Sequence, residues 1–343
     1  MKWMIYGATG YTGELIAHHA KRMGYRPVLA GRNKHKVETL ATRVDMPWRA
    51  FALDDIDTVA SQLEDIDLVI HCAGPFEDTA EPMMKACLKA FTHYLDITGE
   101  IEVFELAYSL RAAAAEAGVI LCPGVGFDVI PTDCIAARLN AQMPNATHLS
   151  LGFDSSSRMS RGTALTGLRR LHKGGAIRED GTIKNVPLAY RTRRINFGDG
   201  EKLAMTIPWG DVATAFYSTG IANIDVYVPA SPRLVQRMKR LNWVRRAFTF
   251  KTLRKQLEKK ILQSPAGPDR QERNEHYTWV WGEARNAAGE VITIRQKVLN
   301  GYELTSRGSV ELAIYILRNQ LKPGYYTPSR LYGAKLIDRF LVD

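Results

Sequence analysis

Residues 7–13, GATGYTG, place three glycines directly after a short apolar run and before a helix-forming run that starts at Glu14. This order predicts a strand, a glycine turn and a helix. The first glycine would permit the turn, the second would admit a pyrophosphate, and the third would let the helix pack on the sheet. Free N–H groups at a helix start attract anions. The predicted chemistry is dinucleotide binding, through Gly7, Thr9, Gly10, Tyr11, Thr12 and Gly13.

The spacing of these glycines is GxxGxxG, whereas many dehydrogenases have GxGxxG, so the next segment has to support the assignment. A second predicted strand, residues 25–31, ends before Arg32, about twenty residues beyond the last glycine. NAD enzymes have an acidic residue there, whereas this chain has a guanidinium that can bind a 2′-phosphate through two hydrogen bonds. Arg32 and Asn33 therefore predict NADP as the cofactor, and the alternative is a solvated arginine at a strand end.

Two further strand ends are predicted to contact the same cofactor. Asp54 follows the strand at 48–53, where a carboxylate can accept a hydrogen bond from an adenine amino group. The alternative is that this acidic pair, Asp54 and Asp55, caps the next helix. The strand at 67–73 ends beside the predicted nicotinamide position, because ligands lie outside the carboxyl ends of parallel strands. Its contributing residues would be Ala73, Gly74, Pro75 and Phe76.

Reduction by a nicotinamide also needs a proton donor for the atom that gains negative charge. The candidates at later strand ends are Tyr94, Asp96, Glu100 and Asp128, with Asp133 nearby. The alternative for Asp96 and Asp128 is that they hold loops through backbone N–H groups. The Tyr-x-x-x-Lys spacing of short-chain reductases is absent from the sequence. No single donor is selected by these patterns.

The elements that must position these residues alternate along the first part of the chain. Besides the strands above, apolar runs near 93–96 and 119–122 predict strands, and helices are predicted at 34–43, 56–63 and 103–116. Such alternation is typical of a parallel sheet covered by helices. The ends of the later strands would then converge on one crevice.

Taken together, the motifs GATGYTG, AGR, HCAGPF, YLDITGE and CPGVGFDVIPTD resemble those of the saccharopine dehydrogenase-like oxidoreductases. Within that family they are similar to the branch that includes trans-acting enoyl reductases. Residues 302–305 and 327–328 are similar to the family's closing segments. The likeness covers about the first 135 and the last 45 residues.

The resemblance implies an α/β fold, in which a Rossmann-type doubly wound parallel sheet carries an inserted α+β substrate domain. We expect an NADP-binding domain at 1–130, an inserted substrate or docking domain at 131–304, and C-terminal helices at 305–343 that return to the first domain. The resemblance also implies hydride transfer from NADPH, but it does not carry over a substrate. We expect reduction of a C=C (enoyl) or C=N bond in a hydrophobic or acyl-linked substrate. The alternative is a non-catalytic NADP sensor or docking protein.

The middle region has its own patterns. Alternating polarity at 221–228, 276–283 and 291–298 predicts antiparallel strands, and a mixed sheet covering the cofactor is the simplest assembly. The serine-rich stretch at 154–163 leads into a predicted helix at 164–172. It is either an anion-binding loop or simply a solvated one.

Positive charge is concentrated in residues 233–260, which contain eleven basic residues and one acidic residue, Glu258. This local excess equals the formal net charge of the whole chain, +10. Apolar residues interleave with the charge at helical spacing. The pattern favours an anionic membrane surface or an acidic acyl carrier protein as partner, and the alternative is a pair of surface helices with basic outer faces. The basic residues are Arg233, Arg237, Lys239, Arg240, Arg245, Arg246, Lys251, Arg254, Lys255, Lys259 and Lys260.

Nucleic acid is a third possible partner, but no recognition motif accompanies the charge. No stretch has the length of a membrane span, and the first strand begins too early for a signal peptide before it. The four cysteines form no CxxC pair, which predicts neither a disulfide framework nor a metal site. We expect a cytoplasmic protein, either wholly so or peripheral to the membrane, and we consider a homodimer compatible with the sequence.

Overall fold

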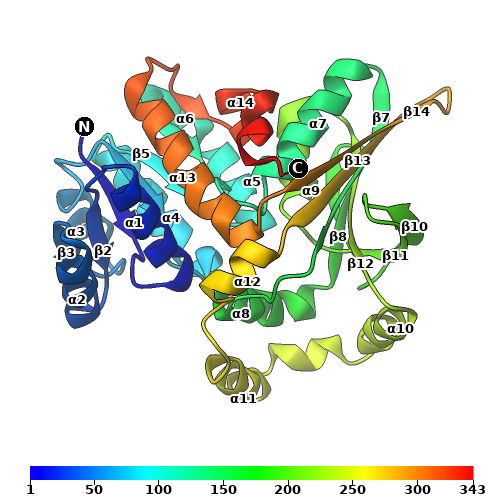
Figure 1. Ribbon diagram of the computed structural model, residues 1–343, viewed down its shortest axis with the longest axis horizontal. Helices are drawn as coiled ribbons and strands as arrows, with labels where there is room; N and C mark the ends of the chain where they lie inside the picture. The colour runs from blue at the N-terminus through cyan, green and yellow to red at the C-terminus, as the bar shows by residue number, and fades with distance from the viewer. Residues whose placement is uncertain (343) are drawn as a thin grey trace. The chain divides into compact units, whose positions relative to one another are not determined.

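The computed structural model describes residues 1–342, apart from the side chains of residue 246 and residues 251–253. Two of the basic residues noted above, Arg246 and Lys251, therefore have side chains outside the described part. The chain divides into two compact units. The first comprises Met1–Ile130 and Tyr302–Gly333, and the second comprises Pro131–Gly301 and Ala334–Asp343. Figure 1 labels their elements.

The first unit contains a seven-stranded sheet of order β15-β6-β5-β4-β1-β2-β3 with parallel neighbours throughout. Strand order reverses between β1 and β4, which is where open α/β sheets bind ligands. This arrangement confirms the predicted Rossmann-type sheet. Its strands are β1 (Trp3–Tyr6), β2 (Val28–Gly31), β3 (Trp48–Ala50), β4 (Leu68–His71), β5 (His93–Asp96), β6 (Ile120–Cys122) and β15 (Gly324–Tyr325).

The strands β1, β2 and β4 are buried along their whole length, as a parallel sheet covered on both faces requires. The helix expected over 103–116 is two helices, because the backbone leaves helical geometry at Leu110 (φ −84°, ψ 3°). The helices of this unit are α1 (Tyr11–Arg22), α2 (Lys34–Val44), α3 (Ile56–Ser61), α4 (Phe76–Lys89), α5 (Ile101–Ser109), α6 (Arg111–Glu116), α13 (Gly301–Arg318), which starts at the unit boundary, and α14 (Pro328–Tyr332).

The second unit is built on an eight-stranded mixed sheet, whose main path is β10-β11-β12-β7-β13-β14, while β8 pairs with β12 and β9. Only β7 and β12 run parallel among its described pairs. Long, alternating β13 and β14 form a hairpin (Figure 1). The strands are β7 (Ala146–Ser155), β8 (Gly175–Glu179), β9 (Thr182–Val186), β10 (Thr192–Asn196), β11 (Glu201–Thr206), β12 (Asn223–Pro229), β13 (Thr278–Asn286) and β14 (Val291–Val298).

The three alternating stretches predicted as strands coincide with β12, β13 and β14, so the mixed sheet is confirmed. That it covers the cofactor stays a prediction. The helix expected at 164–172 starts earlier, at Arg161 within the serine-rich stretch, because Ser160 Oγ accepts a hydrogen bond from the N–H of Thr163 and caps it. The helices of this unit are α7 (Ile130–Gln142), which starts at the unit boundary, α8 (Arg161–Arg170), η1 (Leu171–Lys173), α9 (Asp211–Thr219), α10 (Pro232–Leu241), η2 (Arg245–Thr249), α11 (Lys251–Leu262), α12 (Arg270–Glu275) and η3 (Ala334–Phe340).

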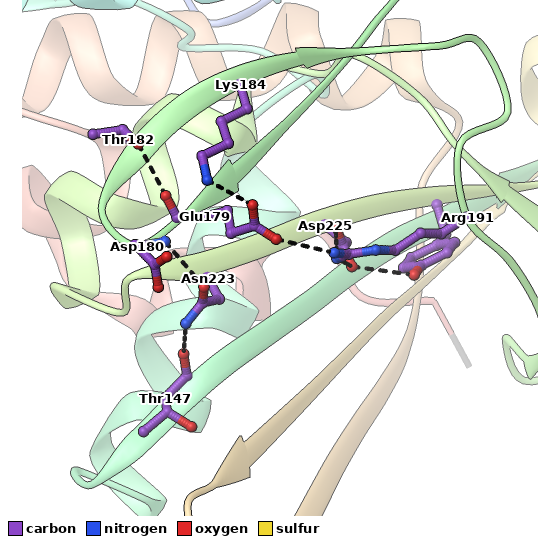
Figure 2. A network of polar contacts seen from close by, with 9 residues as sticks. Thr147, Glu179, Asp180, Thr182, Lys184, Arg191, Asn223 and Asp225 are labelled. Atoms are coloured by element: carbon purple, nitrogen blue, oxygen red, sulfur yellow. Dashed lines mark hydrogen bonds and ion pairs between the residues drawn. The ribbon is translucent and has the colours of Figure 1, made fainter.

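Figure 2 shows a network of polar contacts that links neighbouring strands of this sheet. Arg191 binds both carboxylate oxygens of Asp225, at 2.9 and 2.7 Å, and lies 3.5 Å from Glu179. Glu179 also accepts a 2.7 Å hydrogen bond from Lys184 on the neighbouring strand. Asn223 joins β12 to β7 by donating to the carbonyl of Thr147. These arginine and lysine charges are therefore matched within the sheet.

The last ten residues differ from our expectation that all of 305–343 returns to the first unit. Residues 334–343 group with the second unit, because Leu341 bridges to Val298 at the end of β14. In addition, Arg138 binds Asp338 through two 2.7 Å contacts. A short chain segment follows whichever surface offers backbone partners, and hydrophobic periodicity does not reveal that choice. Across residues 1–342, no helix is both long and apolar enough to cross a bilayer.

Candidate cofactor and catalytic site

The three glycines of residues 7–13 lie where backbone atoms approach most closely. Gly7 has φ +81°, and a Cβ there would lie 2.6 Å from the backbone nitrogen of Ala73. A Cβ at Gly13 would lie 2.4 Å from the carbonyl oxygen of Gly7 and 2.9 Å from Cα of Ala8. The turn therefore requires glycine at both positions, for a left-handed backbone at Gly7 and for helix packing at Gly13.

The start of α1 is suited to an anion. Gly10 occupies the N-cap position, and no side chain caps the helix there in the described structure. The first helical hydrogen bond runs from Glu14 N–H to the Gly10 carbonyl at 2.9 Å. Preceding N–H groups of a helix lack helical acceptors, so a phosphate oxygen can supply one. The cradle therefore fits the diphosphate of a dinucleotide, beside Thr9, Tyr11 and Thr12.

We expect Gly13→Ala to weaken both the fold and cofactor binding. The new methyl group would meet backbone atoms that cannot rotate away, so α1 must move off β1 at a cost of about 1–3 kcal/mol in the free energy of unfolding. Gly167→Ala is a matched control, since a Cβ at Gly167 meets nothing within 4 Å. Thermal unfolding and NADPH titration of both variants would check this. Equal stability of the two variants would contradict the close packing.

Arg32 lies exposed directly after β2, and its charge reaches the end of β1. Burial raises the pKa of Tyr6 to about 12, the positive charge of Arg32 opposes that rise, and Asp54 adds to it. Tyr6 donates its hydroxyl to the carbonyl of Phe51 at 3.0 Å. Arg32 and Asp54 therefore lie on the same rim of the sheet as the glycine cradle, as NADP recognition would require.

Two neighbouring polar residues act as helix caps. The Asn33 Oδ1 atom accepts a 3.0 Å hydrogen bond from Lys36 N–H at the start of α2. Asp55 accepts 2.8 and 2.5 Å hydrogen bonds from the N–H and hydroxyl of Thr58 at the start of α3. The capping alternative thus applies to Asp55. Asp54 is exposed and remains the predicted partner of the adenine amino group. Contacts of Arg32, Asn33 and Asp54 with a cofactor stay predictions.

The loop after β4 is held by a carboxylate from a different strand end. Glu100, 2% exposed, accepts hydrogen bonds from the N–H groups of Phe76 (3.1 Å) and Glu77 (2.8 Å) at the start of α4. Glu100 therefore fixes the segment of Ala73, Gly74, Pro75 and Phe76, which includes a cis Gly74–Pro75 bond. Both of its carboxylate oxygens have a structural use.

Asp96 and Tyr94 are also committed to the fold. Asp96 is fully buried and accepts hydrogen bonds from Thr98 N–H (3.0 Å), Gly124 N–H (2.8 Å) and the Tyr94 hydroxyl (2.7 Å). Burial raises the pKa of Asp96 to about 6, although these hydrogen bonds oppose the rise. Burial and Asp96 raise the pKa of Tyr94 well above its usual value. The interpretation of Asp96 as a loop anchor is the one that its contacts support.

Asp128 has a different environment. It lies in the loop after β6, where its Oδ2 atom would be 2.7 Å from a Cβ placed on Gly99, and it remains partly exposed. Burial, followed by the negative charge of Glu100, raises the pKa of Asp128 to about 7. The adjacent Phe127 donates its N–H to the Thr305 hydroxyl of α13 at 2.9 Å, which fixes the loop. Asp128 can therefore hold a proton at neutral pH.

His71, at the end of β4, was not among the predicted site residues. It is fully buried, and its Nε2 lies 3.0 Å from Thr79 Oγ1. Thr79 donates its hydrogen to the Ala73 carbonyl at 2.6 Å, so Nε2 must donate and Nδ1 is an acceptor with no partner among the described residues. Burial lowers the pKa of His71 to about 3, which keeps the ring neutral. The sequence feature that could have singled out His71 is its position at the end of an otherwise apolar strand.

Asp133, the remaining predicted candidate, lies in the second unit at the start of α7 and accepts a hydrogen bond from Ser218. It is fully buried. The glycine cradle, Tyr94, Asp96, Glu100 and Asp128 all belong to the first unit, at the carboxyl ends of its parallel strands.

Part of the chain is similar in sequence to known proteins. Residues 3–122 match the sequence model of the saccharopine dehydrogenase NADP binding domain. The chain is 31% identical over 150 residues to a saccharopine dehydrogenase-like oxidoreductase of Bos taurus, covering 38% of this chain and 35% of the bovine protein. It is 30% identical over 138 residues to a trans-acting enoyl reductase of Mycobacterium tuberculosis, covering 38% and 33%. The matches thus span about a third of the length of these curated relatives.

Among solved structures, the chain is similar to apo saccharopine dehydrogenase (L-Glu forming) from Saccharomyces cerevisiae. The TM-score is 0.65 at 12% identity, with 99% of this chain and 98% of that chain covered. This similarity establishes the fold of the chain across both units and does not extend to the reaction.

Proposed function

We propose that the protein is an NADPH-dependent reductase, because residues 3–122 match the sequence model of the saccharopine dehydrogenase NADP binding domain. Its substrate is a hydrophobic or acyl-linked compound with a polarised C=C or C=N bond. The observation that carries the proposal is the partly exposed Asp128, with a pKa of about 7, at the carboxyl edge of the sheet that holds the glycine cradle. A proton donor and a dinucleotide cradle on one edge are what a reductase needs.

Residues that follow β1, β2 and β3 would bind the cofactor. Gly7 permits the turn, Gly13 permits close packing of α1, and Gly10 leaves room for a diphosphate at the start of α1. Arg32 offers its guanidinium to a 2′-phosphate. The acidic residue that would bind an unmodified ribose is absent from this strand end. The bound nicotinamide would supply a hydride to the electrophilic carbon of the substrate.

Asp128 completes the reduction. Its carboxyl group donates a proton to the substrate atom that receives the electron pair of the C=C or C=N bond, and the resulting carboxylate takes a proton back from solvent. Tyr94, Asp96 and Glu100 position this loop and the neighbouring one, because each is hydrogen-bonded to the protein itself. Asp128 is partly exposed, and its pKa is raised to about 7, so it can donate a proton near neutral pH.

Three arginines of the second unit are bound to partners within that unit. Arg193 binds both oxygens of Glu283 at 2.9 and 2.8 Å, and Arg191 binds both oxygens of Asp225. Arg178 is buried and donates to the carbonyls of Val212 and Gly181. An amino diacid needs cationic groups that are not already matched, so these three arginines are not suited to bind one. The enoyl reductase named among the relatives supports an acyl-linked substrate.

The test is fluorescence titration of the purified protein with NADPH and NADH, followed by NADPH oxidation with a panel of 2-enoyl thioesters, cyclic imines and an oxo diacid paired with an amino acid. We expect preferential NADPH binding and turnover of an enoyl thioester or an imine. Tight NADPH binding with no turnover across the panel would instead support a non-catalytic NADP sensor. Turnover of the oxo diacid pair alone would overturn the proposed substrate class.

A further inference from the structure

The basic segment, residues 233–260, lies in the second unit and runs from α10 through η2 to α11 (Figure 1). Part of its apolar content serves the unit's own core. Val235 and Met238 on α10 pack with Ala189, Met205 and Ala230. The apolar face of α10 is therefore covered by the protein itself, and the alternative of a surface helix with a basic outer face applies to α10.

The helix α11 is also anchored within its unit. Glu258, the one acidic residue of the segment, lies 3.2 Å from Arg169 on α8 and 3.8 Å from Arg254. The carbonyl of Leu262 accepts a 3.1 Å hydrogen bond from Arg161 on α8. The single negative charge of the segment is thus already shared by two arginines, so it does not offset the neighbouring cations.

Between these two anchored helices, apolar side chains protrude into solvent. Trp243 is 90% exposed, Phe250 is 67% exposed, and Val244 is 57% exposed. We call these three residues the apolar tip. Their backbone takes part in the fold, because the N–H groups of Trp243 and Val244 donate to the carbonyls of Arg240 and Leu241. Burying an exposed tryptophan or phenylalanine would be favourable, so the tip is suited to contact an apolar phase.

Basic residues precede and follow the apolar tip in the sequence. Seven basic side chains of the segment are exposed and form no ion pair within the part of the chain that the structure describes. They contrast with Arg245, which is bonded to the His172 carbonyl at 2.8 Å. The seven are Arg233, Arg237, Lys239, Arg240, Lys255, Lys259 and Lys260.

We propose that the basic segment docks the protein on an anionic lipid bilayer, with the apolar tip entering the headgroup region and the flanking cations lying over the lipid phosphates. Two observations favour a bilayer over a protein partner. Single protruding aromatic side chains enter a soft interface readily, whereas protein interfaces bury packed central clusters. The segment carries one carboxylate, that of Glu258, among its eleven cations, and such a uniform positive charge matches the uniformly negative potential of an anionic leaflet.

The experiment is cosedimentation of the full chain with vesicles of phosphatidylcholine alone or phosphatidylcholine with phosphatidylglycerol. We expect binding to the anionic vesicles only, falling by about tenfold or more from low to physiological salt, because each cation near the surface contributes. The double variant Trp243→Ala/Phe250→Ala should lose about tenfold or more in binding. The triple variant Arg237→Ala/Lys239→Ala/Arg240→Ala should lose at least as much.

Matched controls separate docking from general surface properties. Phe91→Ala removes an aromatic side chain that is 72% exposed in the first unit, and Lys322→Ala removes an exposed cation there. Both should bind anionic vesicles like the unmodified protein. Brominated lipids should quench the emission of the unmodified protein more than that of Trp243→Phe, which reports entry of that one side chain.

Equal binding to neutral and anionic vesicles would overturn the proposal, and so would unchanged binding of both tip and cation variants. Concentration-dependent self-association that Trp243→Ala abolishes, without vesicle binding, would identify the tip as a contact between copies of the chain and contradict the lipid assignment. Capture of polyglutamate without vesicle binding would indicate an acidic protein partner instead. Cofactor binding is measured on the same samples, so failure here leaves the proposed reductase function unaffected.

Discussion

Replacing Asp128 with Asn is expected to lower kcat/KM for reduction by about 10²- to 10⁴-fold, while NADPH binding is retained. The side chain keeps its size but loses the transferable proton. Because Asp128 lies after β6 and the glycine cradle lies after β1, the substitution removes no group that we assign to the cofactor. Single-turnover NADPH oxidation and fluorescence titration of the same preparation would separate the two effects.

The pH dependence gives an independent measurement. The pKa of Asp128 is raised to about 7, so the carboxyl group is protonated below that pH and ionised above it. The value of kcat/KM should therefore be constant below about pH 7 and fall about tenfold for each further unit. Asp128→Asn should lack this decline. A decline that persists in Asp128→Asn would assign it to another group and contradict the proton-donor role.

Glu100→Gln is the companion variant, because the negative charge of Glu100 is the second cause of the raised Asp128 pKa. Removing that charge should move the decline to lower pH. A purely structural role for Asp128 would leave the position of the decline unchanged. Thermal unfolding of Glu100→Gln is measured alongside, since two N–H groups of α4 donate to that carboxylate.

The second large effect is expected for Arg32→Ala, which should weaken NADPH binding by about 10- to 100-fold and leave NADH binding nearly unchanged. Hydrogen bonds to charged groups contribute about 1.5–3 kcal/mol each, and only NADPH carries the 2′-phosphate. Titrating both cofactors against unmodified protein and variant would check this. Lys34→Ala is the matched control, since it removes an exposed cation at the start of α2. An equal loss for NADH would contradict the assignment of Arg32.

Much of the first unit could be predicted because its signals are local. The glycine spacing, the apolar runs and the Arg32 position each depend on residues adjacent in the chain, and the parallel sheet follows from their alternation. The predicted antiparallel strands of the second unit coincide with β12, β13 and β14 for the same reason. Side-chain alternation and turn residues encode such elements directly.

Contacts between distant residues could not be predicted in this way. Glu100 directly precedes α5, yet its carboxylate accepts a hydrogen bond from Phe76 N–H at the start of α4. These two residues are 24 positions apart in the chain. Asp96 joins the loop after β6, and Leu341 pairs with the end of β14. Each contact depends on which strands become neighbours. The role of α10 was ambiguous for a similar reason, because an amphipathic pattern does not say whether a core or a membrane covers the apolar face.

The position of Glu100 also determines where a second anion can bind. The helices α1 and α4 follow β1 and β4, which are neighbours in the sheet, and both helices start at the same edge. The Glu100 carboxylate already satisfies and neutralises the start of α4, whereas no side chain caps the start of α1 in the described structure. We therefore expect a diphosphate to bind at the start of α1 and to be repelled from the start of α4. The built-in carboxylate would then set the direction in which an elongated, charged ligand lies across the two strands.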